Sequence, residues 1–146
     1  MWTHIAIHHS LSGKDTDIDD VYQWHVNERG WQDVGYHFVI PADGKLQEGR
    51  KLSMDGAHTR GWNDKAIGIC LMGNFNKKRP TDHQLDTLER LVDGLMKIYD
   101  IPVKNIKGHR DLDNRTCPGD NFSVENFKER FTLLNRIKKY IKKKVG

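Results

Sequence analysis

The sequence of 146 residues is poor in cysteine and has no long apolar segment. Its two cysteines, Cys70 and Cys117, are too few for the disulfide framework of a small secreted scaffold. No apolar run approaches the roughly 18 residues of a membrane-spanning helix. The N-terminus lacks a cationic segment followed by an unbroken apolar one, so we expect no signal peptide. The length suits one domain over residues 1–146, with no separate binding domain.

Basic charge is concentrated near the C-terminus. The chain has a net charge of +4, but residues 127–144 hold eight basic residues and one acidic residue, so the remainder is net negative. A basic chain raises the hypothesis of nucleic-acid binding, but the interleaved aromatic or glycine motifs of nucleic-acid-binding folds are missing, and we expect no nucleic-acid partner. The basic segment is then either the solvated face of a packed helix, which we favour, or a contact with anionic envelope material.

Hydrophobic periodicity predicts alternating strands and helices. Period-2 alternation predicts that the first strand is half-buried, and a continuous apolar run predicts one strand that is buried on both faces. The expected strands span 3–9, 35–40, 45–49, 66–72 and 106–109, and the expected helices span 17–29, 81–101 and about 123–144. This order predicts the α/β class, with a central mixed β-sheet flanked by helices.

The last of these helices is predicted to pack on the rest of the domain. Its apolar residues follow helical spacing and form one stripe: Val124, Phe127, Phe131, Leu134, Ile137 and Ile141. Functional residues are then expected on loops at the strand ends.

Two histidines and a cysteine are candidate metal ligands. A catalytic zinc ion needs three side-chain ligands, for which imidazole and thiolate are suitable donors. His8 ends the first expected strand, His109 ends the last, and Cys117 lies in a polar loop where a small apolar side chain has little reason to be. Cys70, in contrast, lies within the buried apolar run and is interpreted as a core residue. A blue-copper site is disfavoured because no methionine lies near Cys117 in sequence.

Six ordered motifs give the sequence a family resemblance. The motifs are IAIHHS, QWH-x₄-GW-x-DVGYHFVI, DG-x₃-EGR, GAHTRGWN, IGICLMGNF and GHRD-x₆-CPG. In this order they resemble the zinc-dependent N-acetylmuramoyl-L-alanine amidases of the phage lysozyme and peptidoglycan recognition protein superfamily. The resemblance implies a central mixed sheet flanked by helices, with a zinc ion (Zn2+) in an open groove that takes a glycan and its stem peptide.

The resemblance also implies roles for individual residues. The zinc ligands fall on His8, His109 and Cys117, and the catalytic tyrosine of the G-Y-H motif falls on Tyr36. Phage amidases commonly have lysine two residues before the cysteine, where this sequence has Arg115. Arginine stays charged and cannot move a proton, so Arg115 is expected only to stabilise the oxyanion. Tyr36 is expected to orient the attacking water or to shuttle its proton.

Further expectations concern the substrate and the setting. His58, Trp62 and His37 are candidates for the substrate groove, although a regular strand points His37 away from Tyr36. The resemblance implies hydrolysis of the amide between N-acetylmuramic acid and L-alanine by a monomeric phage endolysin. It would be made in the host cytoplasm and would act on the cell wall or periplasm after release. The alternative from the same superfamily is a non-catalytic peptidoglycan-binding module, against which Cys117 argues because such modules typically replace this ligand.

Overall fold

The computed structural model describes all residues from 1 to 146. Its strands are β1 (His4–His9), β2 (Phe38–Ile40), β3 (Gln47–Glu48), β4 (Ala66–Leu71) and β5 (Ile106–Gly108). Its helices are α1 (Ile18–Tyr22), α2 (Asp82–Tyr99), α3 (His109–Leu112), α4 (Val124–Lys128) and α5 (Leu133–Val145), with shorter or irregular turns η1 (Gln23–Glu28), η2 (Val103–Asn105) and η3 (Glu129–Phe131).

The strands form one five-stranded sheet in the order β3-β2-β4-β1-β5. β2, β4, β1 and β5 are parallel, and β3 pairs with β2 in the opposite direction. The predicted mixed sheet flanked by helices is therefore confirmed, and β2 and β3 form its antiparallel pair. β1 lies between β4 and β5, so its C-terminal end lies at the same edge of the sheet as theirs.

The expectation of a half-buried first strand is wrong. In β1, Ala6 and His8 are as deeply buried as Ile5 and Ile7 on the other face. An inner strand of a parallel sheet is covered on both sides by crossover segments, whatever its alternation suggests. The burial of His8 follows from this position.

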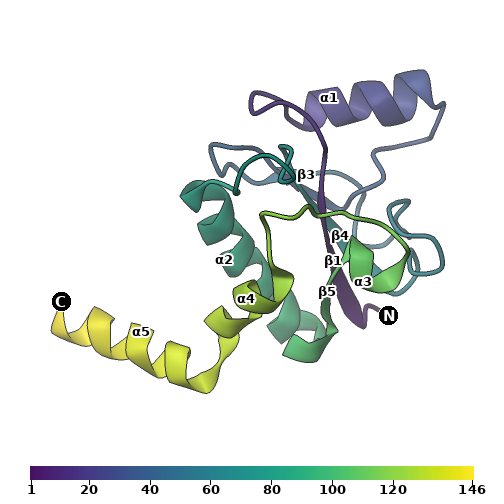
Figure 1. Cartoon of the computed structure of the whole chain (residues 1–146). Helices are drawn as coiled ribbons and strands as arrows, with labels where there is room; N and C mark the ends of the chain where they lie inside the picture. The colour runs from purple at the N-terminus through teal and green to yellow at the C-terminus, as the bar shows by residue number, and fades with distance from the viewer.

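The two faces of the sheet carry cores of different size. A cluster of 19 buried residues, among them Ile5, Ile7 and Ile69, packs one face against α2 and α4. Figure 1 shows these two helices together on one side of the sheet, with α1 at the upper edge and α3 beside β5. The other face carries a cluster of only five buried residues, which includes Val39 and Cys70. His8, the register partner of Cys70, lies on this face, and Val21 of α1 belongs to its small cluster.

The predicted helix at 17–29 is present, but its second half is irregular. Asp17 caps α1 through a capping box, and η1 continues it as a π-helical turn. Because a π-helical turn is wider than an α-helical one, the residues do not keep one α-helical face. Val21 and His25 are buried, whereas Tyr22 is 48% exposed. Gly30 closes the segment with a φ of +73°, in the left-handed region that favours glycine.

The prediction of one packed helix over 123–144 is wrong. The segment is divided into α4, η3 and α5, because Thr132 has an extended backbone and its hydroxyl caps a new helix by accepting from Asn135 N. The first part packs as expected, with Phe127 and Phe131 buried. α5 has no buried residue. In Figure 1 it runs out from the body of the molecule and ends at the C-terminus.

None of the helices combines the length and the hydropathy that a membrane span requires.

Candidate metal centre and active site

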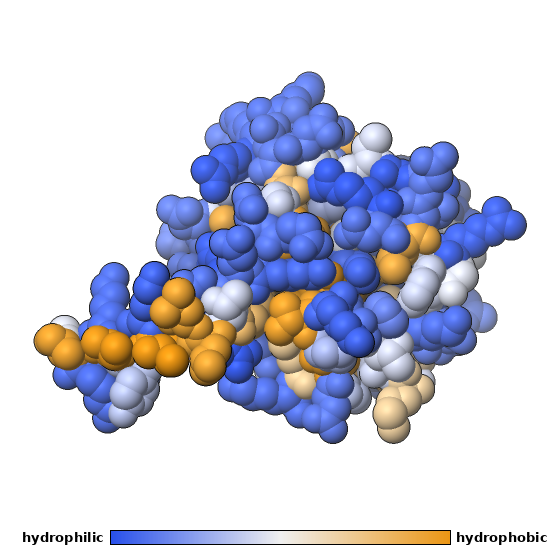
Figure 2. All heavy atoms as spheres, turned by 60° about the horizontal axis from the view of Figure 1, so that its bottom comes forward, coloured by the Kyte–Doolittle hydropathy of each residue, from blue (hydrophilic) through white to orange (hydrophobic).

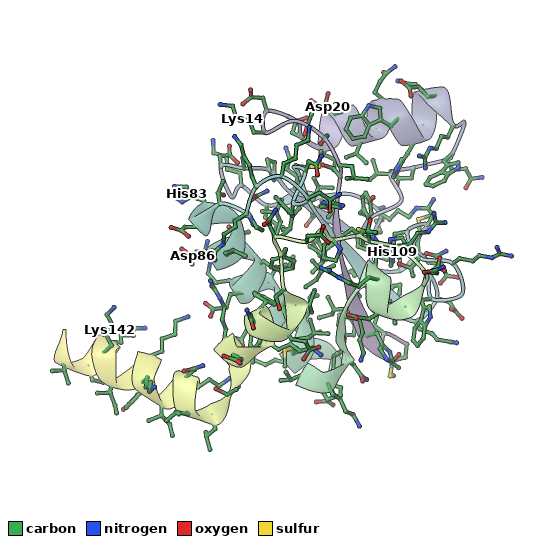
Figure 3. The ribbon with its side chains drawn as sticks, in the orientation of Figure 1. Lys14, Asp20, His83, Asp86, His109 and Lys142 are labelled. Atoms are coloured by element: carbon green, nitrogen blue, oxygen red, sulfur yellow. The ribbon has the colours of Figure 1, made fainter.

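Three predicted ligands meet where β1 and β5 end. His8 lies near the end of β1, His109 begins α3 directly after β5, and Cys117 lies in the following loop. Because β1 and β5 are parallel neighbours, their C-terminal ends bring the two histidines together, with ring centroids 4.6 Å apart. One donor atom from each of the three residues lies within 4.8 Å of the others. Figure 3 shows His109 at the start of α3, on the side of the molecule opposite to α5.

The donor set fits a zinc ion. With bond lengths of roughly 2.05 Å to nitrogen and 2.3 Å to sulfur, tetrahedral coordination separates the nitrogen and sulfur donors by about 3.6 Å. The Sγ atom of Cys117 lies 3.8 Å from Nδ1 of His8. Two imidazoles and one thiolate form a three-ligand set of the kind that leaves a fourth position open at catalytic zinc sites. His8, His109 and Cys117 therefore suit a catalytic rather than a closed structural site.

A hydrogen-bond relay determines which nitrogen of His8 is free. Nε2 of His58 lies 2.9 Å from the carbonyl oxygen of Ala66, which can only accept, so this nitrogen carries the hydrogen. Burial lowers the pKa of His58 to about 3, so its Nδ1 is unprotonated and accepts. Nδ1 of His58 lies 3.0 Å from His8 Nε2 and 2.9 Å from the Thr59 hydroxyl, which is itself 3.3 Å from His8 Nε2. A hydrogen on His8 Nε2 can be donated to either neighbour, and Nδ1 of His8 then keeps its lone pair on the side of Cys117. The relay selects the tautomer that a metal requires.

The cysteine is held in place by backbone and arginine contacts. The N–H of His9 donates to Sγ of Cys117 over 3.3 Å, a contact that favours the thiolate. Burial nevertheless raises the pKa of the Cys117 thiol to about 11, so the thiolate needs a cation nearby. Nη2 of Arg110 donates to the carbonyls of Gly119 and Phe122 at 2.8 and 2.7 Å, which fixes the loop that follows the cysteine.

Tyr36 lies directly against the first ligand. It precedes β2, and its ring centroid is 5.2 Å from that of His8 and 5.5 Å from that of His25. Burial raises the pKa of Tyr36 well above its usual value, with smaller contributions from Cys70 and Cys117. The phenol thus stays protonated near neutral pH and is able to donate a hydrogen bond. Tyr36 also lines a cavity of about 350 Å³ between the loop after β1 and η1.

Arg115 lies at the exposed rim of the site. Its side chain is 64% exposed, and its Nε is 3.6 Å from a carboxylate oxygen of Asp113. Burial lowers the pKa of His109, Asp113 raises it, and Arg115 lowers it further. The arginine charge therefore reaches the ligand cluster, although its head group lies in solvent.

Two candidates for the substrate groove lie elsewhere. His37 is fully buried, donates from Nε2 to the carbonyl of Met54 and accepts the N–H of Gly68 at Nδ1, so it is a core residue. Trp62 packs against His4, at the opposite end of β1 from the ligands. The position of His37 was predictable, because neighbouring residues of a strand point to opposite faces of the sheet. The position of Trp62 was not, because it lies in a loop whose path cannot be predicted from the sequence.

His58 also differs from its expected place. Both of its ring nitrogens are engaged inside the protein, and it supports His8 from behind instead of presenting a free group to substrate. The adjacent Thr59 is buried, and its hydroxyl lies 3.3 Å from Nε2 of His8. Thr59 was not a candidate from its residue type or spacing. The only signal is its position beside His58 in the GAHTRGWN motif.

The absence of a side chain at Gly68 makes room for the His58 ring behind His8. A Cβ atom at this position of β4 would lie 2.4 Å from Cδ2 of His58, closer than carbon atoms approach in proteins. A glycine in the middle of a buried strand commonly marks such a close approach. Gly68 therefore contributes to the site although it has no functional group.

Fold and site together define a family. The profile of the N-acetylmuramoyl-L-alanine amidases matches residues 2–120, and the chain belongs to this family. Among solved structures, the N-acetylmuramoyl-L-alanine amidase LysC from Clostridium intestinale URNW superposes with a TM-score of 0.82 at 36% identity, covering 88% of this chain and 84% of that one.

Curated relatives include phage and animal proteins. The endolysin of Enterobacteria phage T3 is 32% identical over 137 residues, which cover 89% of this chain and 87% of the endolysin. Peptidoglycan-recognition protein LB of Drosophila melanogaster is 35% identical over 131 residues, or 84% of this chain. The chain spans only 56% of that recognition protein.

Proposed function

We propose that this protein is a zinc-dependent amidase that hydrolyses the bond between N-acetylmuramic acid and L-alanine in peptidoglycan, as a phage endolysin does. The observation that carries the proposal is the convergence of His8, His109 and Cys117 within 4.8 Å, in the chemistry of a catalytic zinc site. The family match and the likeness to a phage endolysin over most of both chains support it.

The metal would be held by the two imidazoles and the thiolate. Zinc bound there supplies a Lewis acid that polarises the amide carbonyl and lowers the pKa of water. His58 keeps Nδ1 of His8 available through its hydrogen bond to Nε2. Arg110 holds the loop that carries Cys117.

Tyr36 and Arg115 would act on the substrate amide. The Tyr36 phenol keeps its proton because burial raises its pKa, and it can donate a hydrogen bond to the carbonyl oxygen as negative charge develops. Arg115 adds a permanent positive charge at the rim. Attack by water at the lactyl carbonyl breaks the C–N bond and leaves a carboxylate on the muramic acid side. The nitrogen gains a proton and leaves as the free amino group of L-alanine.

The cavity beside Tyr36 suits a polar substrate. It is lined by serines of the loop after β1 and by residues of η1 that include His25, Glu28 and Arg29. Charged groups of both signs and hydroxyls can form hydrogen bonds with a stem peptide.

The retained cysteine favours an enzyme over a binding module. A recognition module needs no open metal position, whereas here all three donors are present and Nδ1 of His8 is directed at Cys117. Both hypotheses predict binding to the cell wall, and only the amidase predicts product.

Digestion of purified peptidoglycan followed by mass spectrometry tests the proposal. We expect new free amino groups on L-alanine and no new reducing sugar ends. Chelation should abolish product formation, and added zinc should restore it. His8→Gln is expected to remove activity, whereas His4→Gln, about 13 Å away at the other end of the same strand, should retain it. Wall binding without product by the zinc-loaded wild type would leave the binding module as the function.

A further inference from the structure

None of the apolar residues of α5 is buried. Six of them are exposed, by fractions from 44% to 82%: Leu133, Leu134, Ile137, Tyr140, Ile141 and Val145. At 100° per residue they occupy an arc of about 140° on one side of the helix, which we call the α5 stripe. Figure 2 shows the stripe as a continuous hydrophobic row along the projecting helix. A row of this kind that stays in water is unfavourable, so a partner is expected.

The rest of the α5 surface is strongly basic. The helix has six basic residues and no acidic one: Arg136, Lys138, Lys139, Lys142, Lys143 and Lys144. Arg136 and Lys139 pair with Asp93 and Glu89 of α2, at 3.3 and 2.7 Å. The other four lysines form no ion pair within the chain. Two ion pairs thus connect the base of the helix to α2, and its basic end forms none.

We propose that α5 anchors the protein to the surface of an anionic lipid bilayer. The α5 stripe would enter the boundary between headgroups and acyl chains, and the unpaired lysines would contact lipid phosphates. Tyr140 is an aromatic side chain with a polar end, suited to this boundary, and Nζ of Lys144 lies 5.7 Å from its ring centroid.

A second copy of the chain, a nucleic acid or a glycan strand would match either the α5 stripe or the lysines, but not both. A second copy of the chain would cover the stripe but would bring two sets of lysines together. A nucleic acid or a glycan strand with acidic groups would pair the lysines but would leave the stripe in water. An anionic bilayer offers an apolar layer directly below a layer of negative charge, which is the arrangement of groups on α5.

Anchoring through α5 leaves the metal centre accessible. Figure 3 places Lys142 and His109 at opposite ends of the molecule. The helix also projects away from the sheet, so its attachment to a surface does not require the domain to change. The protein would thus be concentrated at the membrane with its site directed away from α5.

Vesicle sedimentation with the full zinc-loaded chain tests the proposal. We expect the protein to pellet with vesicles of phosphatidylglycerol and phosphatidylcholine, and to stay in the supernatant with phosphatidylcholine alone. High salt should reduce the bound fraction because the charges lie at the surface. The vesicles contain no peptidoglycan, so the outcome does not depend on the amidase activity.

Two variants separate the contributions of charge and stripe. Replacing Lys142, Lys143 and Lys144 together by glutamine should weaken partitioning on the order of 100-fold, at roughly fivefold per lysine. Ile137→Gln with Ile141→Gln should weaken it at least about tenfold, because two apolar side chains are lost. None of these side chains is buried, so both variants should keep the fold.

A matched control removes the same charge elsewhere. Lys45, Lys51 and Lys104 are exposed and form no side-chain hydrogen bond, and their joint replacement by glutamine should leave partitioning unchanged. Equal binding to neutral and anionic vesicles, no binding at all, or full binding by the stripe variant would overturn the proposal. So would a wild-type dimer that the stripe variant disperses in analytical ultracentrifugation, since a second copy would then cover the stripe.

Discussion

Replacement of His58 by phenylalanine isolates the relay behind the metal centre. The change keeps a ring of similar size but removes the donor to the carbonyl of Ala66 at 2.9 Å and the Nδ1 atom that lies 3.0 Å from His8 Nε2 and 2.9 Å from the Thr59 hydroxyl. Each buried polar group left without a partner lowers the free energy of unfolding by about 1–3 kcal/mol. Loss of the group that orients a ligand histidine typically weakens metal binding by roughly 10–100-fold. We therefore expect His58→Phe to lose both stability and zinc affinity.

The two effects are separated by a control at His37. This buried histidine also forms two hydrogen bonds with the backbone, but neither involves a ligand. His37→Phe should lower the free energy of unfolding to a similar extent and leave zinc affinity unchanged. Urea denaturation of zinc-free protein measures the first quantity, and competition with a chelating dye measures the second. Equal zinc affinity in His58→Phe and His37→Phe would refute the role of the relay and reduce His58 to a structural residue.

Three further changes have defined outcomes. Burial lowers the pKa of His25 to about 4 from 6.5, so between these values only the unfolded state takes up this proton. The free energy of unfolding should fall by at most about 1.4 kcal/mol per pH unit for this group as the pH drops through that window, and His25→Asn should remove this part of the slope in urea titrations of zinc-free protein. Gly68→Ala would force a Cβ atom to within 2.4 Å of His58, so we expect a loss of about 1–3 kcal/mol together with weaker zinc binding. Arg110→Lys keeps the positive charge but loses the hydrogen bonds to the carbonyls of Gly119 and Phe122, which hold the loop after Cys117. Zinc affinity, measured by competition with a chelator, should therefore fall roughly tenfold. An unchanged zinc affinity would show that the loop keeps its conformation without Arg110.

Much of the fold follows from local sequence patterns. The buried strand β4 and the start of α2, where Thr81 forms a capping box, each depend on a few neighbouring residues, and both lie where the sequence predicts them. The burial of β1 was not predictable in this way, because it depends on which strands lie beside it. The break at Thr132 has a local signal, because threonine is a common N-cap residue and here caps a new helix. The helical spacing of apolar residues continues across it, and this spacing led to the prediction of one helix.

The candidate site, like the fold, was predictable only in part. His8, His109 and Cys117 were selected because their residue types and order match a family pattern, and the structure brings them together. His58 belongs to the same motif set, but sequence gives no direction to its side chain. Its role became visible only from the two contacts that engage both ring nitrogens.

The order of the strands has a consequence for how the protein matures. His8 lies on the first strand, whereas Cys117 comes 109 residues later, after every strand of the sheet. The three donors therefore cannot meet until the chain has been synthesised as far as residue 117. A chain cut short before the loop that carries Cys117 could form much of the sheet and still assemble no metal centre. Synthesis of the loop that carries Cys117 is thus the step after which the metal centre can form.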